Sequence, residues 1–282
     1  CTYCGLDFME YQPRYLDTTL FKERLTELGS FGLKSIMYAG EGEPFLDENI
    51  LKIINQANIE GLTPYIFTNG SMLDINTTQF LRDNGASLVI NIDSLNKETY
   101  EELTGVKDSF KRIYNNIQKI RSQFKDTYSQ IGNYGLRRVA INTVVSHKNK
   151  GELVKIQDFC EDDFAFVCNK PMNIGRAIGN AQFSDVVSNL DTIPLGTTSD
   201  NTWCAYMRNG ISVGANGDIL ICAYSLESAG LLGNIRQDGL RQYIGVANKR
   251  VDEFYHKTTH SRCILRHPEY QKFITEIGGK HD

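Results

Sequence analysis

Seven cysteines are many for a chain of this kind, and two of them, Cys1 and Cys4, form a C-x2-C pair that can bind a metal; the others are Cys160, Cys168, Cys204, Cys222 and Cys263. Thiolates bind zinc and iron-sulfur clusters, and an odd number of cysteines does not suit a framework of disulfides. A C-x2-C pair such as Cys1 and Cys4 also occurs in thioredoxin-like redox sites, where it normally precedes a helix beside a βαβ unit. Two of the others, Cys160 and Cys168, fall in a predicted helix and strand, and we interpret them as small buried apolar residues.

A glycine-rich segment that includes Gly40, Gly42 and Glu43 follows a predicted strand. Glycine lets the backbone approach a ligand closely, and a glutamate there supplies a negative charge beside a bound cation. An ordinary strand-to-helix turn has a similar composition, because glycine and proline are turn formers. The segment therefore indicates a binding site only in combination with the cysteines.

Short apolar runs alternate with longer amphipathic stretches up to about residue 170. The short runs are rich in β-branched and aromatic residues and predict buried strands at 35–39, 64–68, 87–93, 138–145 and 163–168. The stretches between them predict helices near 18–29, 47–60, 75–84, 108–125 and 150–160, with Thr18, Asp47 and Asp74 as N-terminal caps. Repeated strand-helix-strand units predict a parallel sheet covered by helices, and we expect a sixth strand before Cys1.

Sheets of this kind carry their chemistry where the strands end, at one rim. The predicted strand ends bring seven candidate residues to that rim: Gly40, Gly42, Glu43, Asn69, Asp93, Ser94 and Asn142. Polar residues at strand ends also form satisfied turns, which remains an alternative for Asp93 and Ser94.

The pattern changes after residue 170. Residues 181–200 predict a linker, because they are rich in polar turn-forming residues and have little periodicity. In the tail, 201–282, an Asn216-Gly217 pair separates two alternating apolar runs and predicts a β-hairpin over 211–221.

Composition narrows the class of protein. The net charge of -4 gives no broad electrostatic reason to bind nucleic acid or an anionic membrane. No apolar run approaches the roughly 20 residues that cross a bilayer, so a cytoplasmic location is the default expectation. The chain begins at Cys1 rather than Met, and we expect a preceding segment.

Together and in this order, the motifs of residues 1–180 resemble the radical S-adenosylmethionine (radical SAM) superfamily. Its C-x3-C-x2-C loop has an aromatic residue before the last cysteine; Cys1, Tyr3 and Cys4 match the end of that loop, and the first cysteine would lie upstream. The glycine-rich segment resembles the family's glycine-glycine-glutamate-proline element. The resemblance implies an α/β fold, a partial (β/α)6 TIM-like barrel.

The resemblance also implies the cofactors. Three thiolates on a 4Fe-4S cluster leave one iron open, and in the family this iron binds S-adenosylmethionine, which one-electron transfer cleaves to a 5'-deoxyadenosyl radical. It implies that nine residues bind the cofactor: Tyr3, Gly40, Gly42, Glu43, Asn69, Asp93, Ser94, Asn142 and Arg176. The sequence assigns no catalytic acid or base.

The tail resembles the SPASM and twitch regions, the auxiliary-cluster domains of one radical SAM subgroup. Cys204, Gly217 and Cys222 have the spacing C-x12-G-x4-C that opens those regions, and 175–177 and 232–240 resemble their flanking segments. The resemblance implies a small β-hairpin/helix domain over 201–282 that holds an auxiliary 4Fe-4S cluster.

The end of the tail departs from that pattern. A twitch region usually ends in C-x2-C, whereas Arg266 stands where the partner of Cys263 would be. Three thiolates would leave one iron of the auxiliary cluster open to substrate, to water, or to His260 or His267. Histidines of this kind are more often exposed loop residues.

These expectations define an enzyme that cleaves S-adenosylmethionine reductively and abstracts hydrogen from a substrate. The resemblance favours a ribosomally synthesised peptide in natural-product maturation, and an aminocyclitol or sugar-type small molecule is the alternative. It also implies an electron donor such as flavodoxin or ferredoxin and, for a peptide substrate, a peptide-recognition protein. The alternative from another class is a non-catalytic zinc-binding adaptor that uses the same cysteines.

Overall fold

The structure is a computed structural model that describes residues 1–5, 15–39, 42–131, 134–161, 163–169, 175–177, 180–183, 210–220, 222, 231–237 and 239–244. The contacts divide the chain into two compact units. Unit 1 is Cys1–Leu6, Lys34–Pro171 and Gly175–Thr197, and unit 2 is Asp7–Leu33, Met172–Ile174 and Thr198–Asp282. The predicted boundaries at 180 and 200 stay a prediction.

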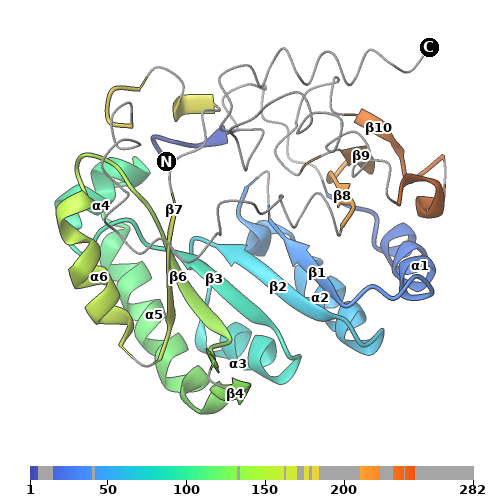
Figure 1. Ribbon diagram of the computed structural model, residues 1–282, viewed down its shortest axis with the longest axis horizontal. Coiled ribbons are helices and arrows are strands. Elements are labelled where there is room, and N and C mark those ends of the chain that lie inside the picture. The colour runs from blue at the N-terminus through green and yellow to red at the C-terminus, as the bar shows by residue number, and fades with distance from the viewer. Residues whose placement is uncertain are drawn as a thin grey trace. The chain divides into compact units, whose positions relative to one another are not determined.

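Unit 1 is built on a parallel sheet of five strands in the order β1-β2-β3-β6-β7. The strands are β1 (Ser35–Tyr38), β2 (Thr63–Thr68), β3 (Ser87–Asn91), β6 (Val139–Val144) and β7 (Ala165–Asn169). All neighbouring strands pair in parallel. Between β3 and β6, for example, Leu88 lies opposite Val139 and Asn91 lies opposite Asn142. All five predicted strands are therefore confirmed, and the arrangement is that of a partial (β/α) barrel (Figure 1).

Five helices of unit 1 follow the strands: α2 (Ile50–Ile59), α3 (Ile75–Asp83), α4 (Lys97–Thr104), α5 (Phe110–Phe124) and α6 (Leu153–Cys160). Short 3-10 turns precede two of them, η2 (Pro44–Leu46) and η4 (Lys150–Glu152). The ribbon in Figure 1 shows α2, α3, α5 and α6 along one side of the sheet. The core lies between these layers, where Ile54, Ile66, Ile90 and Ile117 are fully buried.

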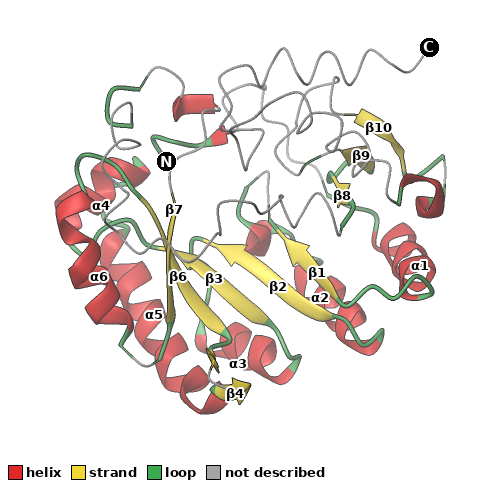
Figure 2. Cartoon of the chain, in the orientation of Figure 1, coloured by secondary structure: helices red, strands yellow, loops and turns green. Residues whose placement is uncertain are grey.

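Unit 2 contains α1 (Thr18–Gly29) and a small antiparallel sheet in the order β10-β9-β8. The strands are β8 (Ser212–Val213), β9 (Asp218–Leu220) and β10 (Leu231–Asn234), followed by η8 (Leu240–Tyr243), as Figure 2 shows. The predicted hairpin is confirmed as β8 and β9. Gly217 occupies its turn with φ of +89°, a conformation that residues with a Cβ disfavour.

Two of the predicted caps were wrong, and one helix and one hairpin were missed. The cap of α1 is Asp17 rather than Thr18, because the Asp17 carboxylate accepts hydrogen bonds from the backbone N–H of Thr19 and Leu20. Asp47 ends η2 instead of capping α2, which begins at Ile50. The helix α4 and the hairpin β4 (Ser129–Ile131) and β5 (Tyr134–Leu136) were not predicted.

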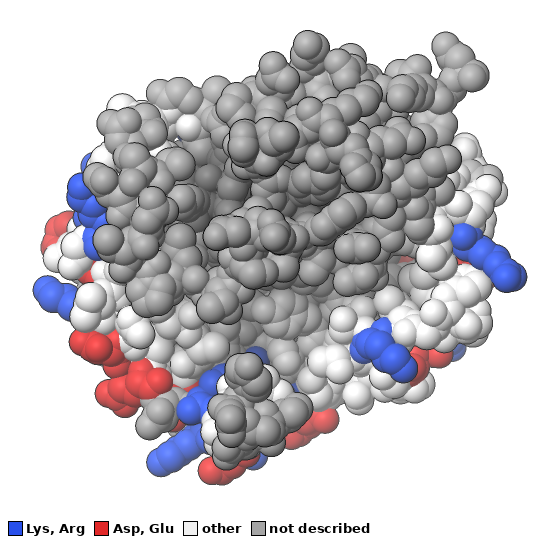
Figure 3. All heavy atoms as spheres, viewed as in Figure 1, with Lys and Arg blue, Asp and Glu red and all other residues white. Residues whose placement is uncertain are grey.

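The described surface has no single-sign field in the view of Figure 3, where Lys and Arg are interspersed with Asp and Glu. Within the described part of the chain, no helix is long and apolar enough to cross a bilayer.

Candidate functional site

The cysteine pair of unit 1 lies in a turn held by its own backbone. The Cys4 N–H donates to the Cys1 carbonyl over 3.2 Å, and the Thr2 N–H donates to the Leu103 carbonyl over 2.8 Å. The Cys4 carbonyl in turn accepts from the Arg176 N–H over 2.9 Å. Because backbone groups make all three bonds, both thiols stay free, with Cys1 exposed and Cys4 partly buried.

Tyr3 fixes this turn to the carboxyl end of the sheet. Its hydroxyl donates to Asp93 Oδ2, and Asp93 Oδ1 accepts from the Val144 N–H at 2.8 Å. The Tyr3 ring also packs edge-on against Phe183, with centroids 6.0 Å apart. Tyr3 is therefore held by Asp93, which follows β3, and Asp93 is held in turn by the backbone at the end of β6.

Burial sets the acid-base properties of this pair. Asp93 is 1% exposed, and burial raises the pKa of its carboxyl to about 6, although the bonds from Tyr3 and Val144 lower it. Burial first, and then the adjacent Asp93 charge, raise the pKa of the Tyr3 phenol well above its usual value. Tyr3 thus stays protonated and remains a hydrogen-bond donor to Asp93.

Glu43 forms a second fixed carboxylate at the end of β2. Its Oε1 accepts from Thr68 Oγ1 at 2.6 Å and its Oε2 from the Asn69 N–H at 2.8 Å, and Phe45 N–H lies 3.4 Å from Oε1. Burial raises the pKa of Glu43, and these hydrogen bonds oppose the shift. The preceding Gly42 has φ of +147°, so glycine at this position has a conformational reason.

Two other predicted residues have side chains that bind protein groups. The Ser94 hydroxyl lies 2.8 Å from each carboxylate oxygen of Glu152, and the Leu95 N–H donates to Glu152 Oε2 at 3.0 Å. Asn142 stands in a row of amides across three strands: its Nδ2 donates to Asn91 Oδ1 at 2.7 Å, and Asn169 Nδ2 donates to its Oδ1. Ser94 and Asn142 therefore have structural partners, and their predicted contact with a cofactor stays a prediction.

Several partners were missed from the sequence. Asn169 ends β7, so the rule that located Asn142 at a strand end applies to it equally. Glu152 and Asn149 gave no such signal, because they lie at the start of η4 and α6, where polar residues are common. Asn149 Nδ2 donates to the carbonyl oxygens of Asp93 at 2.7 Å and Val144 at 2.9 Å, which supports the loop behind Tyr3.

The structure describes the predicted metal ligands only in part. Cys222 is buried just after β9, and the Arg176 side chain is exposed. Gly40, Cys204, Cys263, His260 and His267 lie outside the described residues. In the described ranges no group of three metal-ligating side chains occurs, and the third thiolate beside Cys1 and Cys4 stays a prediction.

Comparison with protein-family models matches residues 1–156 to the Radical SAM superfamily. The chain therefore belongs to the radical SAM superfamily. This is a family of enzymes, so the zinc-binding adaptor is not supported. Membership implies a 4Fe-4S cluster and S-adenosylmethionine, and the donor set fits them: free thiols lie on a fixed turn, and the half-buried carboxylate of Glu43 lies at the same end of the sheet for a cationic ligand.

One curated relative is the S-adenosylmethionine-dependent nucleotide dehydratase of Flammeovirga pacifica, 32% identical over 170 residues. The match covers 57% of this chain and 54% of the relative, so the chain spans about half of that protein's length.

Two solved structures share the fold. A histidine-tagged form of anSMEcpe with bound AdoMet has a TM-score of 0.66 at 16% identity, covering 99% of this chain and 89% of that one. Streptococcus suis SuiB bound to S-adenosylmethionine has a TM-score of 0.63 at 16% identity, covering 86% and 62% of the two chains.

Proposed function

We propose that this protein cleaves S-adenosylmethionine reductively and uses the product to abstract hydrogen from an organic substrate. One observation carries the proposal: backbone bonds and the Tyr3–Asp93 bond hold the Cys1–Cys4 turn at the end of the sheet where Glu43 is also fixed. When bound, the cluster supplies the electron that breaks the carbon-sulfur bond.

The chain's own residues position the reactants. Cys1 and Cys4 supply two of the three cluster thiolates, and Glu43 provides a negative charge for the ammonium group of S-adenosylmethionine. Thr68 and the Asn69 N–H fix the direction of that carboxylate, so its orientation does not depend on the ligand. Pre-organised charge of this kind lowers the cost of binding.

The tail completes the proposal as a SPASM/twitch-like region. Cys204, Cys222 and Cys263 would hold an auxiliary 4Fe-4S cluster, which would supply a second site for electron transfer or for binding the substrate. Support comes from the hairpin, because Gly217 takes the conformation that its turn requires and Cys222 is buried two residues after β9 ends.

A ribosomally synthesised peptide is the substrate class we propose. Solved structures of anSMEcpe and SuiB contain a bound peptide, and their likeness covers 99% and 86% of this chain. A nucleotide or sugar-type small molecule is the second candidate, because the 32% identical relative is named a nucleotide dehydratase. The alignment with that relative covers 57% of the chain, so it supports the small-molecule candidate for that part of the chain only.

The reaction needs a one-electron donor, for which flavodoxin or ferredoxin is suitable, and a cytoplasmic location provides both the donor and a reducing environment. A peptide substrate would also require a peptide-recognition protein or domain.

Iron content and cofactor cleavage test the proposal in the full-length protein, reconstituted anaerobically. We expect about eight irons per chain for two cubanes. Cys4→Ala should abolish 5'-deoxyadenosine formation. Cys222→Ala should retain cofactor cleavage and lose substrate turnover, and Cys160→Ala, at a buried site in unit 1, is the matched control for loss of a thiol. Reconstituted protein that holds zinc and no iron would overturn the proposal.

Mass spectrometry separates the two substrate classes. Reaction mixtures that contain a short precursor peptide should show a mass change in the peptide that depends on S-adenosylmethionine and Cys4. A mass change in a nucleotide or sugar, with the peptides unaltered, would favour the second candidate.

A further inference from the structure

Helix α1 and the tail strands form one apolar core in unit 2. Ile219 of β9, Ile235 after β10 and Leu240 of η8 are each at most 2% exposed. Residues from both parts of the sequence pack against these three: Leu16, Leu20, Leu28, Ile211, Leu232 and Tyr243. The helix that follows the cysteine pair in the sequence is thus part of the fold of the tail.

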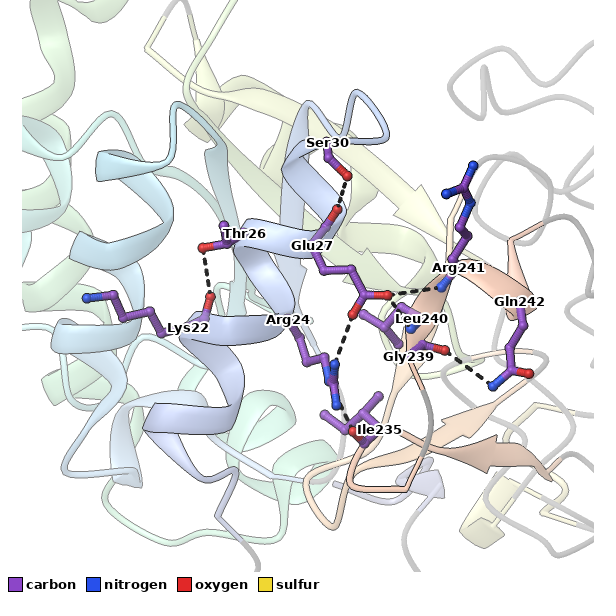
Figure 4. Close-up of polar contacts among 10 residues, drawn as sticks. All are labelled: Lys22, Arg24, Thr26, Glu27, Ser30, Ile235, Gly239, Leu240, Arg241 and Gln242. Carbon is purple, nitrogen blue, oxygen red and sulfur yellow. Dashed lines mark hydrogen bonds and ion pairs between the residues drawn. The ribbon is translucent and has the colours of Figure 1, made fainter.

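Polar contacts fix how α1 meets η8 (Figure 4). Glu27 Oε1 accepts from the backbone N–H of Leu240 at 2.8 Å and of Arg241 at 3.3 Å. These N–H groups open a short helix and have no partner within it. The second oxygen, Oε2, pairs with Arg24 Nη1 at 3.0 Å. One oxygen of Glu27 therefore binds η8 and the other binds Arg24.

Arg24 extends this network toward the hairpin. Its Nε donates to the Ile235 carbonyl at 3.1 Å, and the Ile235 N–H donates to the Gly217 carbonyl at 2.8 Å. Gly217 lies in the turn immediately before β9 (Asp218–Leu220). An ion pair and two hydrogen bonds therefore connect Glu27 to the turn before β9, and β9 ends two residues before Cys222.

We propose that Arg24 and Glu27 are positioning residues for Cys222: they hold the hairpin and η8 on α1, and so place this thiolate to bind the auxiliary cluster. The inference rests on the auxiliary cluster of the proposed function. It adds that two residues of α1, about 200 positions before Cys222 in the sequence, control how well that cluster is held.

Two substitutions separate the tasks of Glu27. Glu27→Ala removes both oxygens. Glu27→Gln keeps an amide oxygen for the N–H groups of Leu240 and Arg241 and loses only the ion pair with Arg24. Glu23→Gln, at an exposed position of the same helix, is the control for the loss of one negative charge.

The test measures the tail cluster alone, in full-length reconstituted protein that carries Cys4→Ala. In this parent, electron paramagnetic resonance of the reduced protein reports the auxiliary cluster. Adding Glu27→Ala should decrease the signal or shift its g-values and midpoint potential, and should accelerate amide exchange at Leu240 and Arg241 about tenfold. Glu27→Gln should restore the signal in large part, and Glu23→Gln should match the parent.

The possible failures are distinguishable. A parent with no tail signal and no iron in the tail overturns the auxiliary cluster, and the positioning role with it. A parent signal that stays unchanged in spectrum and potential in Glu27→Ala overturns the positioning role alone. If Glu27→Ala unfolds, Arg24→Lys replaces it, because lysine keeps the charge and lacks the Nε donor to Ile235. An unaltered tail signal in Arg24→Lys likewise overturns the role.

Discussion

Replacing Asp93 with Asn tests whether burial makes the charged form of the carboxylate that binds Tyr3 unfavourable for the stability of the folded protein. Asp93 is 1% exposed, and burial raises its pKa from 3.8 to about 6. The folded protein therefore binds this proton more tightly than the unfolded chain does, and the contribution of Asp93 to stability increases as the pH falls through about 6.

The size of the effect follows from the two pKa values. Between pH 7.5 and pH 5, linkage gives the wild-type protein about 1.4 kcal/mol of additional stability, a factor of about ten in the folded-to-unfolded ratio. Asn has no proton to bind, so Asp93→Asn lacks this gain. The free energy of unfolding of the wild type minus that of Asp93→Asn should therefore increase by about 1.4 kcal/mol as the pH falls over this range.

Urea unfolding followed by far-ultraviolet circular dichroism, at several pH values from 5 to 7.5, measures this difference. Asp158→Asn, at an exposed position on α6, is the matched control for loss of a surface carboxylate. A wild-type-minus-variant difference that is constant over the pH range would refute the argument that burial dominates the electrostatics of Asp93.

Three further predictions concern single side chains. Thr68→Val removes the hydroxyl that orients Glu43, and should lower stability by about 1–2 kcal/mol and weaken S-adenosylmethionine binding in equilibrium dialysis. Gly217→Ala forces a Cβ into a turn with φ of +89°, 3.1 Å from Asn234 Oδ1, and should lower the thermal midpoint and speed amide exchange in β9. Cys160 is buried and its thiol pKa is raised to about 12, so iodoacetamide at neutral pH should label it only after unfolding, as peptide mass spectrometry would show.

The parallel sheet was predictable because its strands are buried on both sides. In β3 the consecutive residues Leu88, Val89 and Ile90 are all buried, a pattern that burial on both faces requires, and the repeated strand-helix-strand units predicted that the strands are parallel. The helix α4 was missed although Asn96 caps it and Gly105 ends it in the left-handed conformation, because its few apolar positions, Tyr100 and Leu103, gave a weak periodic signal.

The sequence predicted which residues lie at the candidate site, but not which groups their side chains bind. Strand ends located Glu43, Asp93 and Asn142 at one rim, since parallel strands end together. Which groups they bind depends on side-chain directions and on distant loops. The bond from Tyr3 to Asp93 joins residues 90 positions apart, and no local pattern contains such information.

The route of the backbone has a consequence for attempts to recombine this protein. Because α1 packs with the tail strands while the segments on either side of it belong to unit 1, the two units are interleaved along the chain rather than consecutive. A truncation near residue 180 would remove the residues against which Leu20 and Leu28 pack. The remaining fragment would then expose the apolar side chains of α1 and tend to aggregate. Chimeras that exchange tails between relatives should therefore include α1 with the tail.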